Sequence, residues 1–253
     1  MIVANLATYP PRRSALVDVA ARIAPQVDQL NIVLNEYDAE LPELKSFDNV
    51  VQILPAEDTK DVGKFYPDVS DAEFVALIDD DLVYPQDYII RAIESLKALG
   101  PGRFCAGYHA SMYQKPAKPT SLKTLVRWLR YGEGRIAEYR KVFTFDKGQS
   151  EALIVDQVAS GTAIMRGTDM PSYAFMAGSQ KYVDVRLARW CFENAIMPVV
   201  LPRSEGWFGR VEFEETIYRT FTKKNPPHVS KEIMSFAFKT KGRGSPIGAR
   251  YEQ

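Results

Sequence analysis

The sequence predicts one α/β domain with a mostly parallel central sheet flanked by helices. Short strand-like apolar segments alternate with segments whose apolar residues recur at helical spacing, an order typical of repeated βαβ units. The chain has 253 residues, enough for one substantial core, and 46% of them are hydrophobic. We find no internal repeat and no low-complexity linker, so a single domain over residues 1–253 is expected.

Pro and Gly residues separate the expected elements of the first half. One helix is predicted at 13–23, ending near Pro25, and another at 88–99, stopped by Gly100-Pro101-Gly102. Strands are predicted at 2–7, 30–34, 50–54, 74–78 and 104–108.

The second half is less regular. Residues 111–148 are rich in Lys, Arg and aromatic side chains, and we expect them to leave the sheet. Strand character returns at 152–164 and 197–201, on either side of a predicted helix at 183–194. Gly, Pro and basic residues dominate from residue 204 onward.

Charge is balanced over the whole chain but not along it. Lys plus Arg and Asp plus Glu both number 32, so no overall field favours nucleic acid as a partner. Acidic residues gather between 36 and 87, whereas 115–140 and 223–250 are basic. The asymmetry suggests a front half that binds a metal and a back half that meets an anionic group. Ordinary solvated surfaces are the alternative for each cluster.

Three features favour a cytoplasmic location. The first residues form a strand-like run without the pattern of a secretory leader, and no apolar stretch reaches the length of a membrane span. Cys105 and Cys191 lie in apolar surroundings without metal-binding spacing, as expected of buried, reduced thiols. We expect a cytoplasmic protein, with contact at the inner face of the membrane as a further option.

An acidic run, Asp79-Asp80-Asp81, directly follows the predicted strand at 74–78. Ligands of parallel α/β sheets bind beyond the carboxyl ends of the strands, where this run is expected. In an extended segment Asp79 and Asp81 point to the same side, and two carboxylates beside diphosphate oxygens suit Mg²⁺ or Mn²⁺. The alternative is an acidic loop that caps the next helix.

The acidic run and four other segments together resemble family 2-like GT-A glycosyltransferases. Residues 74–85 (FVALIDDDLVYP) are similar to the DxD region of that family, in which an apolar strand delivers the acidic motif. The other segments follow in the family's order: Ala7-Thr8-Tyr9-Pro10-Pro11-Arg12, Asp61-Val62-Gly63-Lys64, Ser160-Gly161-Thr162 and Val183-Asp184-Val185. The resemblance covers about residues 1–203. It implies a GT-A fold with a nucleotide-sugar-binding half at 1–110 and an acceptor-binding half at 111–253.

The resemblance also implies how the donor is held. Asp61 is expected to meet the nucleobase, and Asp81 to bind the metal directly. The loop after the first strand is expected to hold the nucleotide, with Asp79 at the ribose or the metal and Asp80 beside it; the loop residues are Thr8, Tyr9, Pro10 and Arg12. Lys64, Arg12 and Arg203 are candidates for the diphosphate by their charge, although an ordinary surface cation is the alternative for each.

Asp184 lies where the family places its catalytic base, at the start of a helix. An inverting transfer needs a carboxylate that deprotonates the acceptor hydroxyl as it attacks the anomeric carbon, and the helix dipole favours the ionised form. A helix cap without chemistry is the alternative. His228 is a candidate third metal ligand by resemblance, and His109 a candidate for the acceptor side; exposed loop histidines are the alternative.

The implied activity is transfer of a sugar, of the hexosyltransferase type, from a nucleoside-diphosphate sugar to a hydroxyl of a glycan or lipid-linked glycan. We expect a UDP-sugar donor, dependence on Mn²⁺ or Mg²⁺, and inversion if Asp184 is the base. Where the family usually has Glu-Asp, this chain has Tyr182-Val183 before Asp184, and the Gln-x-x-Arg-Trp signature of processive synthases is absent. That absence favours transfer of single sugars. Donor sugar, acceptor, linkage and oligomeric state stay open.

Two other functions remain. Residues 79–83 also fit the D-x-D-x-[TV] pattern of HAD-type phosphohydrolases, in which the first Asp attacks phosphorus. That pattern normally ends the first strand, whereas three strands are predicted before Asp79, and no later Asp pair completes its metal site. The other function is a non-catalytic nucleotide- or glycan-binding module, which would not need both the acidic run and Asp184.

Two further segments have open roles. Trp207 and Phe208 form either an acceptor platform on a mobile loop or packing at the sheet edge. Residues 120–131 have apolar positions at helical spacing interleaved with Lys and Arg. This pattern fits a helix on a membrane surface or an ordinary surface helix, and we favour the ordinary helix.

Overall fold

Strands from both halves of the sequence form one eight-stranded sheet in the computed structural model, which describes residues 1–115, 121–122, 125–126, 129, 136–211 and 226–248. The order is β3-β2-β1-β4-β11-β6-β12-β9, and β11 and β9 run against their neighbours while the others are parallel. The strands are β1 (Ile2–Thr8), β2 (Gln29–Leu34), β3 (Val50–Ile53), β4 (Phe74–Ile78), β6 (Phe104–Gly107), β9 (Leu153–Ile154), β11 (Thr162–Met165) and β12 (Met197–Val200). The predicted, mostly parallel α/β class is confirmed.

Helices cover both faces of this sheet. They are α1 (Arg13–Ile23), α2 (Tyr88–Ala98), α4 (Tyr173–Met176), α5 (Val183–Glu193) and α7 (Pro227–Phe236), with the 3-10 helices η1 (Pro10–Arg12), η2 (Ala24–Gln26), η3 (Pro42–Ser46), η4 (Lys60–Phe65), η5 (Ile136–Glu138) and η6 (Gly167–Asp169). The even-numbered residues of β4 pack with α1 and α2, whereas Val75 and Leu77 pack with η4, α4 and α5. Because both faces are covered, every residue of β4 is buried and its sequence is continuously apolar.

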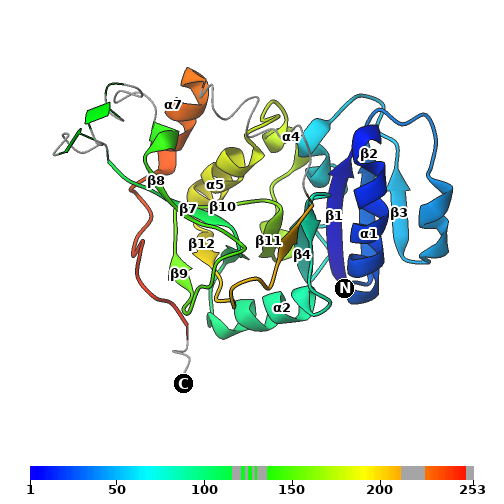
Figure 1. Cartoon of the computed structure of the whole chain (residues 1–253), viewed down its shortest axis with the longest axis horizontal. Coiled ribbons are helices and arrows are strands. Elements are labelled where there is room, and N and C mark those ends of the chain that lie inside the picture. Colours follow the sequence, from blue (N-terminus) through cyan, green and yellow to red (C-terminus); the bar gives the residue numbers. More distant parts are fainter. Residues whose placement is uncertain (116–120, 123–124, 127–128, 130–135, 212–225, 249–253) are drawn as a thin grey trace.

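The second half departs from the predicted pattern. The segment 152–164, expected as one stretch of strand, forms β9, β10 (Gln157–Val158) and β11, which lie in different parts of the fold. β10 joins β7 (Ala110–Tyr113) and β8 (Arg140–Phe143) in a separate three-stranded sheet, so the expected excursion from the central sheet is confirmed. Figure 1 places β8 and α7 at the end of the molecule opposite β1, β2 and β3.

α7 was not predicted. Its apolar side, with Ile233 and Phe236, packs against α5 through Val185 and Ala188. The helix starts at Pro227, a residue type that favours the first turn of a helix. The segment after residue 204 is dominated by Gly, Pro and basic residues, so the few apolar residues at helical spacing in α7 did not indicate a helix.

Most of the segment 120–131 lies outside the described residues. Its four apolar side chains that are described, at Leu122, Leu125, Val126 and Leu129, are exposed. They therefore do not pack on the domain as an ordinary surface helix would. No helix in the described ranges is both long and apolar enough to cross a membrane.

The carboxyl ends of β1, β4, β6 and β12 meet at one edge of the sheet, since these strands run in the same direction. The loops after β1 and β4, the turn before β11 and the start of α5 all lie at this edge. Cys105 and Cys191 are buried free thiols inside the fold, as predicted.

Candidate active site

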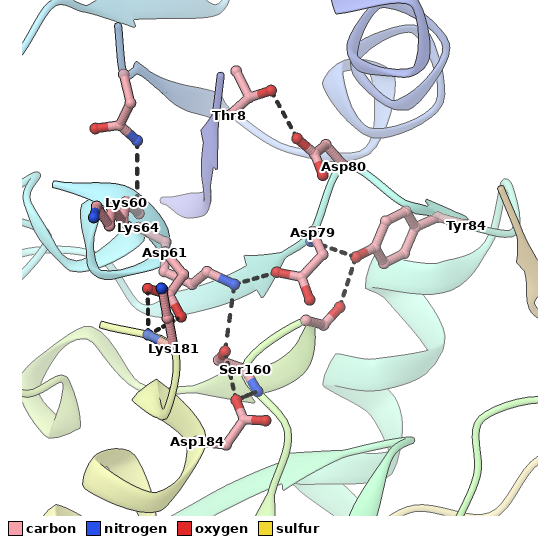
Figure 2. Close-up of polar contacts among 12 residues, drawn as sticks. Thr8, Lys60, Asp61, Lys64, Asp79, Asp80, Tyr84, Ser160, Lys181 and Asp184 are labelled. Atoms are coloured by element: carbon pink, nitrogen blue, oxygen red, sulfur yellow. Dashed lines mark hydrogen bonds and ion pairs between the residues drawn. The ribbon is translucent and has the colours of Figure 1, made fainter. Parts of the chain in front are cut away.

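The acidic run forms a turn between β4 and β5 (Leu82–Val83). The expectation that Asp79 and Asp81 share an extended segment is therefore wrong. The Tyr84 hydroxyl fixes the turn, since it accepts a hydrogen bond from the Asp79 amide at 2.7 Å and donates to the Gly161 carbonyl at 2.6 Å. Tyr84 thus ties the acidic turn to the loop before β11, as Figure 2 shows.

Each aspartate of the turn has a different environment. Asp79 forms an ion pair with Lys64, and Asp80 accepts a hydrogen bond from the Thr8 hydroxyl at 2.7 Å. Within the described part of the chain, no hydrogen bond reaches the Asp81 carboxylate. Of the three carboxylates in this turn, that of Asp81 is therefore the one most available to bind a ligand.

Burial and mutual repulsion make the turn a natural site for a cation. Burial raises the pKa of Asp80 to about 6, against the Thr8 hydrogen bond and the charge of Arg12. Burial and the nearby Asp79 charge raise the pKa of Asp81. Two neighbouring carboxylates with substrate phosphates are a donor set that Mg²⁺ and Mn²⁺ accept, so the residues present fit such an ion.

Lys64 is the buried cation at the centre of the site, with a side chain only 3% exposed. Its ammonium group contacts the carboxylate of Asp79 and lies 3.3 Å from the Ser160 hydroxyl. Burial acts to lower the pKa of Lys64, but the charges of Asp79, Asp184 and Asp61 outweigh it and the pKa is raised. The Asn5 side chain holds the Lys64 carbonyl at 3.0 Å, which anchors η4 to β1.

Asp184 lies in the first turn of α5 and joins the same network. One of its carboxylate oxygens accepts hydrogen bonds from the Ser160 amide at 2.8 Å and from the Ser160 hydroxyl at 2.7 Å. Burial raises the pKa of Asp184 in spite of these donors and of Lys64. In Figure 2, Ser160 lies between Lys64 and Asp184.

Gly161 lets the loop before β11 approach the acidic turn. A Cβ atom at this position would overlap the carboxylate of Asp79. Position 161 must therefore be glycine for the segment Ser160-Gly161-Thr162 to lie this close to Asp79.

Asp61 holds the loop that leads into α5. Both of its carboxylate oxygens lie 2.9 Å from the Lys181 amide, and Lys181 has a left-handed backbone with φ of 73°. Burial raises the pKa of Asp61 to about 6, against the Lys181 hydrogen bond and the charge of Lys64. Its expected contact with a nucleobase stays a prediction.

The remaining donor residues follow β1. Thr8 ends the strand, Tyr9 is partly exposed, and Pro10 and Arg12 belong to η1. Arg12 is buried and near enough to Asp80 and Asp81 to lower the pKa of both, against burial. The structure thus brings the loop after β1 and the acidic turn together.

His228 lies away from this network. It is exposed in the first turn of α7, with its ring 5.3 Å from that of Tyr182. No contact between His228 and an aspartate of the turn is found in the described ranges. Its role as a metal ligand stays a prediction.

Trp207 and Phe208 are packed rather than open. Phe208 is buried, and Trp207 donates to Asp87 at 3.1 Å while the Arg91 guanidinium lies 5.5 Å from its ring. A cavity of about 480 Å³ lies beside Trp207, with Arg203 in its wall. The packing alternative is the one that the structure supports for this aromatic pair.

Sequence reasoning missed Tyr84 and Arg210. Tyr84 lies within the quoted acidic segment, and a tyrosine so close to a buried strand end is a signal that could have been followed. Arg210 pairs with the acidic turn through β13 (Gly209–Arg210), which lies beside β5. Such a pairing between distant segments leaves no local sequence pattern.

No family model and no curated protein matches the chain. Solved structures that resemble it include a 4-diphosphocytidyl-2C-methyl-D-erythritol synthase, with 10% identity, a TM-score of 0.48, and coverage of 86% of this chain and 95% of the other. Glucosyl-3-phosphoglycerate synthase of M. tuberculosis has 14% identity, a TM-score of 0.48, and coverage of 93% and 78%. A mycobacterial protein has 16% identity, a TM-score of 0.48, and coverage of 93% and 72%. At these identities the similarity concerns the fold alone.

Proposed function

We propose that this chain is a metal-dependent glycosyltransferase that moves a sugar from a nucleoside-diphosphate sugar to a hydroxyl of a glycan or lipid-linked glycan. One observation supports this most directly. Ser160 and Lys64 connect the candidate base Asp184 to the candidate metal ligand Asp79 in a single polar network. A base and a metal site at one edge of the sheet are what glycosyl transfer needs.

In this proposal each residue has a defined task. Thr8, Arg12 and the acidic turn hold the diphosphate, and Asp79 and Asp81, with His228 as a candidate, hold Mn²⁺ or Mg²⁺. The ion supplies neutralisation of the charge that develops on the departing diphosphate. Asp184 accepts the proton of the acceptor hydroxyl while the new bond to the anomeric carbon forms and the bond to the diphosphate breaks, which inverts that carbon.

The nature of the donor and the location are parts of the same proposal. A UDP-sugar is the expected donor, with Asp61 at the nucleobase, and the product belongs to polysaccharide biosynthesis. The proposed location is the cytoplasm, and residues 120–131 are the segment proposed to contact the membrane.

A turnover assay tests the proposal. The protein is incubated with a panel of nucleoside-diphosphate sugars and Mn²⁺, and the released nucleoside diphosphate is measured. Release that depends on the metal and on Asp184 supports the transferase. Binding without any release indicates the non-catalytic module instead. Hydrolysis of simple phosphate esters that depends on Asp79 indicates the HAD-type phosphohydrolase, although β1, β2 and β3 all precede Asp79 in the chain.

A further inference from the structure

His109 presents an imidazole without a hydrogen-bond partner on the far side of the acidic turn. Its backbone is fixed at the end of β6, where its amide donates to the Thr162 hydroxyl at 2.9 Å and its carbonyl accepts from the Ala159 amide at 2.8 Å. Its ring lies 5.7 Å from that of Phe145. Within the described chain, no hydrogen bond reaches either ring nitrogen. A partly buried imidazole whose ring nitrogens have no partner among the described residues is available to a ligand.

Arg210 also contacts the Phe145 ring. Its guanidinium carbon is 5.0 Å from the ring centroid, and its side chain is exposed. β13 places it opposite Leu82, and the next amide, of Val211, donates to the Asp81 carbonyl at 3.0 Å. No carboxylate of the described residues forms an ion pair with Arg210. Arg210 is thus a cation that borders the acidic turn, close enough to Asp81 and Asp146 for its charge to act on the pKa of both carboxyl groups.

Arg140 and Arg203 complete a positively charged cluster around His109. Arg140 begins β8, opposite Tyr113, and its guanidinium uses one donor for a hydrogen bond to the Tyr113 side chain, while no ion pair with a described residue is found. Arg203 is buried and donates only to backbone carbonyls, including that of Phe145 at 3.1 Å. It therefore supports the segment that carries Phe145, whereas Arg140 and Arg210 keep donors for a ligand.

The cluster keeps His109 neutral. Burial and then the charges of Arg140, Arg210 and Arg203 lower the pKa of His109 to about 4, with Asp146 as a weaker opposing charge. At neutral pH a ring N–H remains available as a donor, and among the described residues no carboxylate forms an ion pair with Arg140 or Arg203. An anion is the ligand that such a set of groups recognises.

We propose that the acceptor carries an anionic group, a phosphate or a carboxylate, which Arg140 and Arg210 bind with the His109 imidazole as a hydrogen-bond donor. This inference rests on the transferase proposed above and names the chemical class of its acceptor.

His109 and Arg140 lie away from the residues that are proposed to hold the donor diphosphate, whereas Arg210 lies between the two sites at the acidic turn. β6 is two strands away from β4 in the sheet, across β11, which is about 10 Å at ordinary strand spacing. The donor residues follow β1 and β4, whereas His109 follows β6 and Arg140 lies in the separate sheet. The anion site therefore lies on the acceptor side of the acidic turn.

Imidazole NMR tests the inference directly, because the chain holds only two histidines. The signal that is absent from a His109→Gln variant belongs to His109. Inorganic phosphate, and separately acetate, is titrated into wild-type protein saturated with Mg²⁺, which is diamagnetic and leaves the imidazole signals sharp, and with the nucleoside diphosphate that binds it. A saturable shift of the His109 signal supports the proposal, and the stronger of the two anions distinguishes a phosphate from a carboxylate acceptor. A His109 signal that neither anion moves overturns it.

Substitutions provide the second readout. Arg210→Gln and Arg140→Gln are expected to weaken binding of the effective anion about tenfold each. Arg189→Gln is the matched control, since Arg189 is on α5 and pairs with Glu193. Equal affinity in all variants overturns the assignment. If the protein binds a nucleoside diphosphate but no anion, this inference fails while the transferase stands; if it binds no nucleoside diphosphate, the proposed function itself fails.

Discussion

The Ser160 hydroxyl donates to a carboxylate oxygen of Asp184 at 2.7 Å, and the Ser160 amide donates to the same oxygen at 2.8 Å. Both donors leave the second oxygen of Asp184 without a bond from Ser160. The Ser160 hydroxyl also lies 3.3 Å from the ammonium group of Lys64, which pairs with Asp79. The start of α5 is thereby fixed relative to the turn after β4.

Asp184→Asn is expected to abolish glycosyl transfer while nucleotide binding is retained. The amide keeps the shape and can still accept from Ser160, but it cannot take a proton from the acceptor hydroxyl. General-base removal lowers turnover by about a thousandfold. Turnover and calorimetric nucleotide affinity are measured on the same preparation. Loss of both together would assign Asp184 a structural role.

Lys64→Met is expected to move the acid limb of the transfer rate to higher pH, by about one unit. Lys64 lowers the pKa of Asp184 against the larger effect of burial, so its removal raises that pKa further. The base must be ionised, and activity then begins at a higher pH. Lys64→Arg retains the charge and serves as the control. An unchanged pH profile in Lys64→Met, with the fold intact by circular dichroism, would contradict the coupling.

The sequence predicted the elements that local pattern determines. The apolar strand before Asp79 and the helix that carries Asp184 in its first turn are both present, because uninterrupted apolar runs and helical spacing encode them. The partners of the aspartates could not be predicted. Lys64 and Ser160 are 96 residues apart, and their meeting depends on the packing of η4 and the loop before β11.

The missed features have the same cause. β10, β7 and β8 are short strands whose pairing is decided by long-range contacts, and α7 is stabilised by its fit to α5 rather than by its composition. The turn at Asp79 follows from the hydroxyl of Tyr84, which no periodicity in the sequence reveals.

Gly161→Ala is expected to reduce transfer by about a hundredfold, because the new methyl group must displace the Asp79 carboxylate. Gly148→Ala is the matched control, since its new methyl group would lie 3.5 Å from the Glu205 amide nitrogen, an ordinary contact. Turnover and thermal stability are compared for both variants. Equal turnover in the two would show that Asp79 is not held by this contact.

The lowered pKa of His109 is expected to reduce the free energy of unfolding in acid. Its folded pKa of about 4 lies below the unfolded value of 6.5, so the unfolded chain binds a proton that the folded chain does not. Stability from this group is full above about pH 6.5 and is lost as pH falls towards the folded pKa.

The raised pKa values of Asp61 and Asp80 increase the free energy of unfolding as the pH falls, which opposes the effect of His109. The effect of His109 is therefore measured as the difference in pH dependence between wild type and a His109 variant. Between about pH 7 and about pH 5, urea unfolding of wild type should lose about 2 kcal/mol more than that of His109→Gln. Parallel pH dependence of the two proteins would contradict the depressed pKa of His109.

Calorimetry with a panel of nucleoside diphosphates, with and without Mn²⁺, tests the central claim most directly, in wild type and in Asp81→Asn. We predict that one nucleoside diphosphate binds wild type in the presence of Mn²⁺, and that removal of the metal or the Asp81 substitution weakens binding at least tenfold, the loss of one strong charge-assisted contact. Absence of nucleoside-diphosphate binding under every condition, or equal affinity with and without the metal and in Asp81→Asn, would contradict a metal-dependent sugar-nucleotide site at the acidic turn.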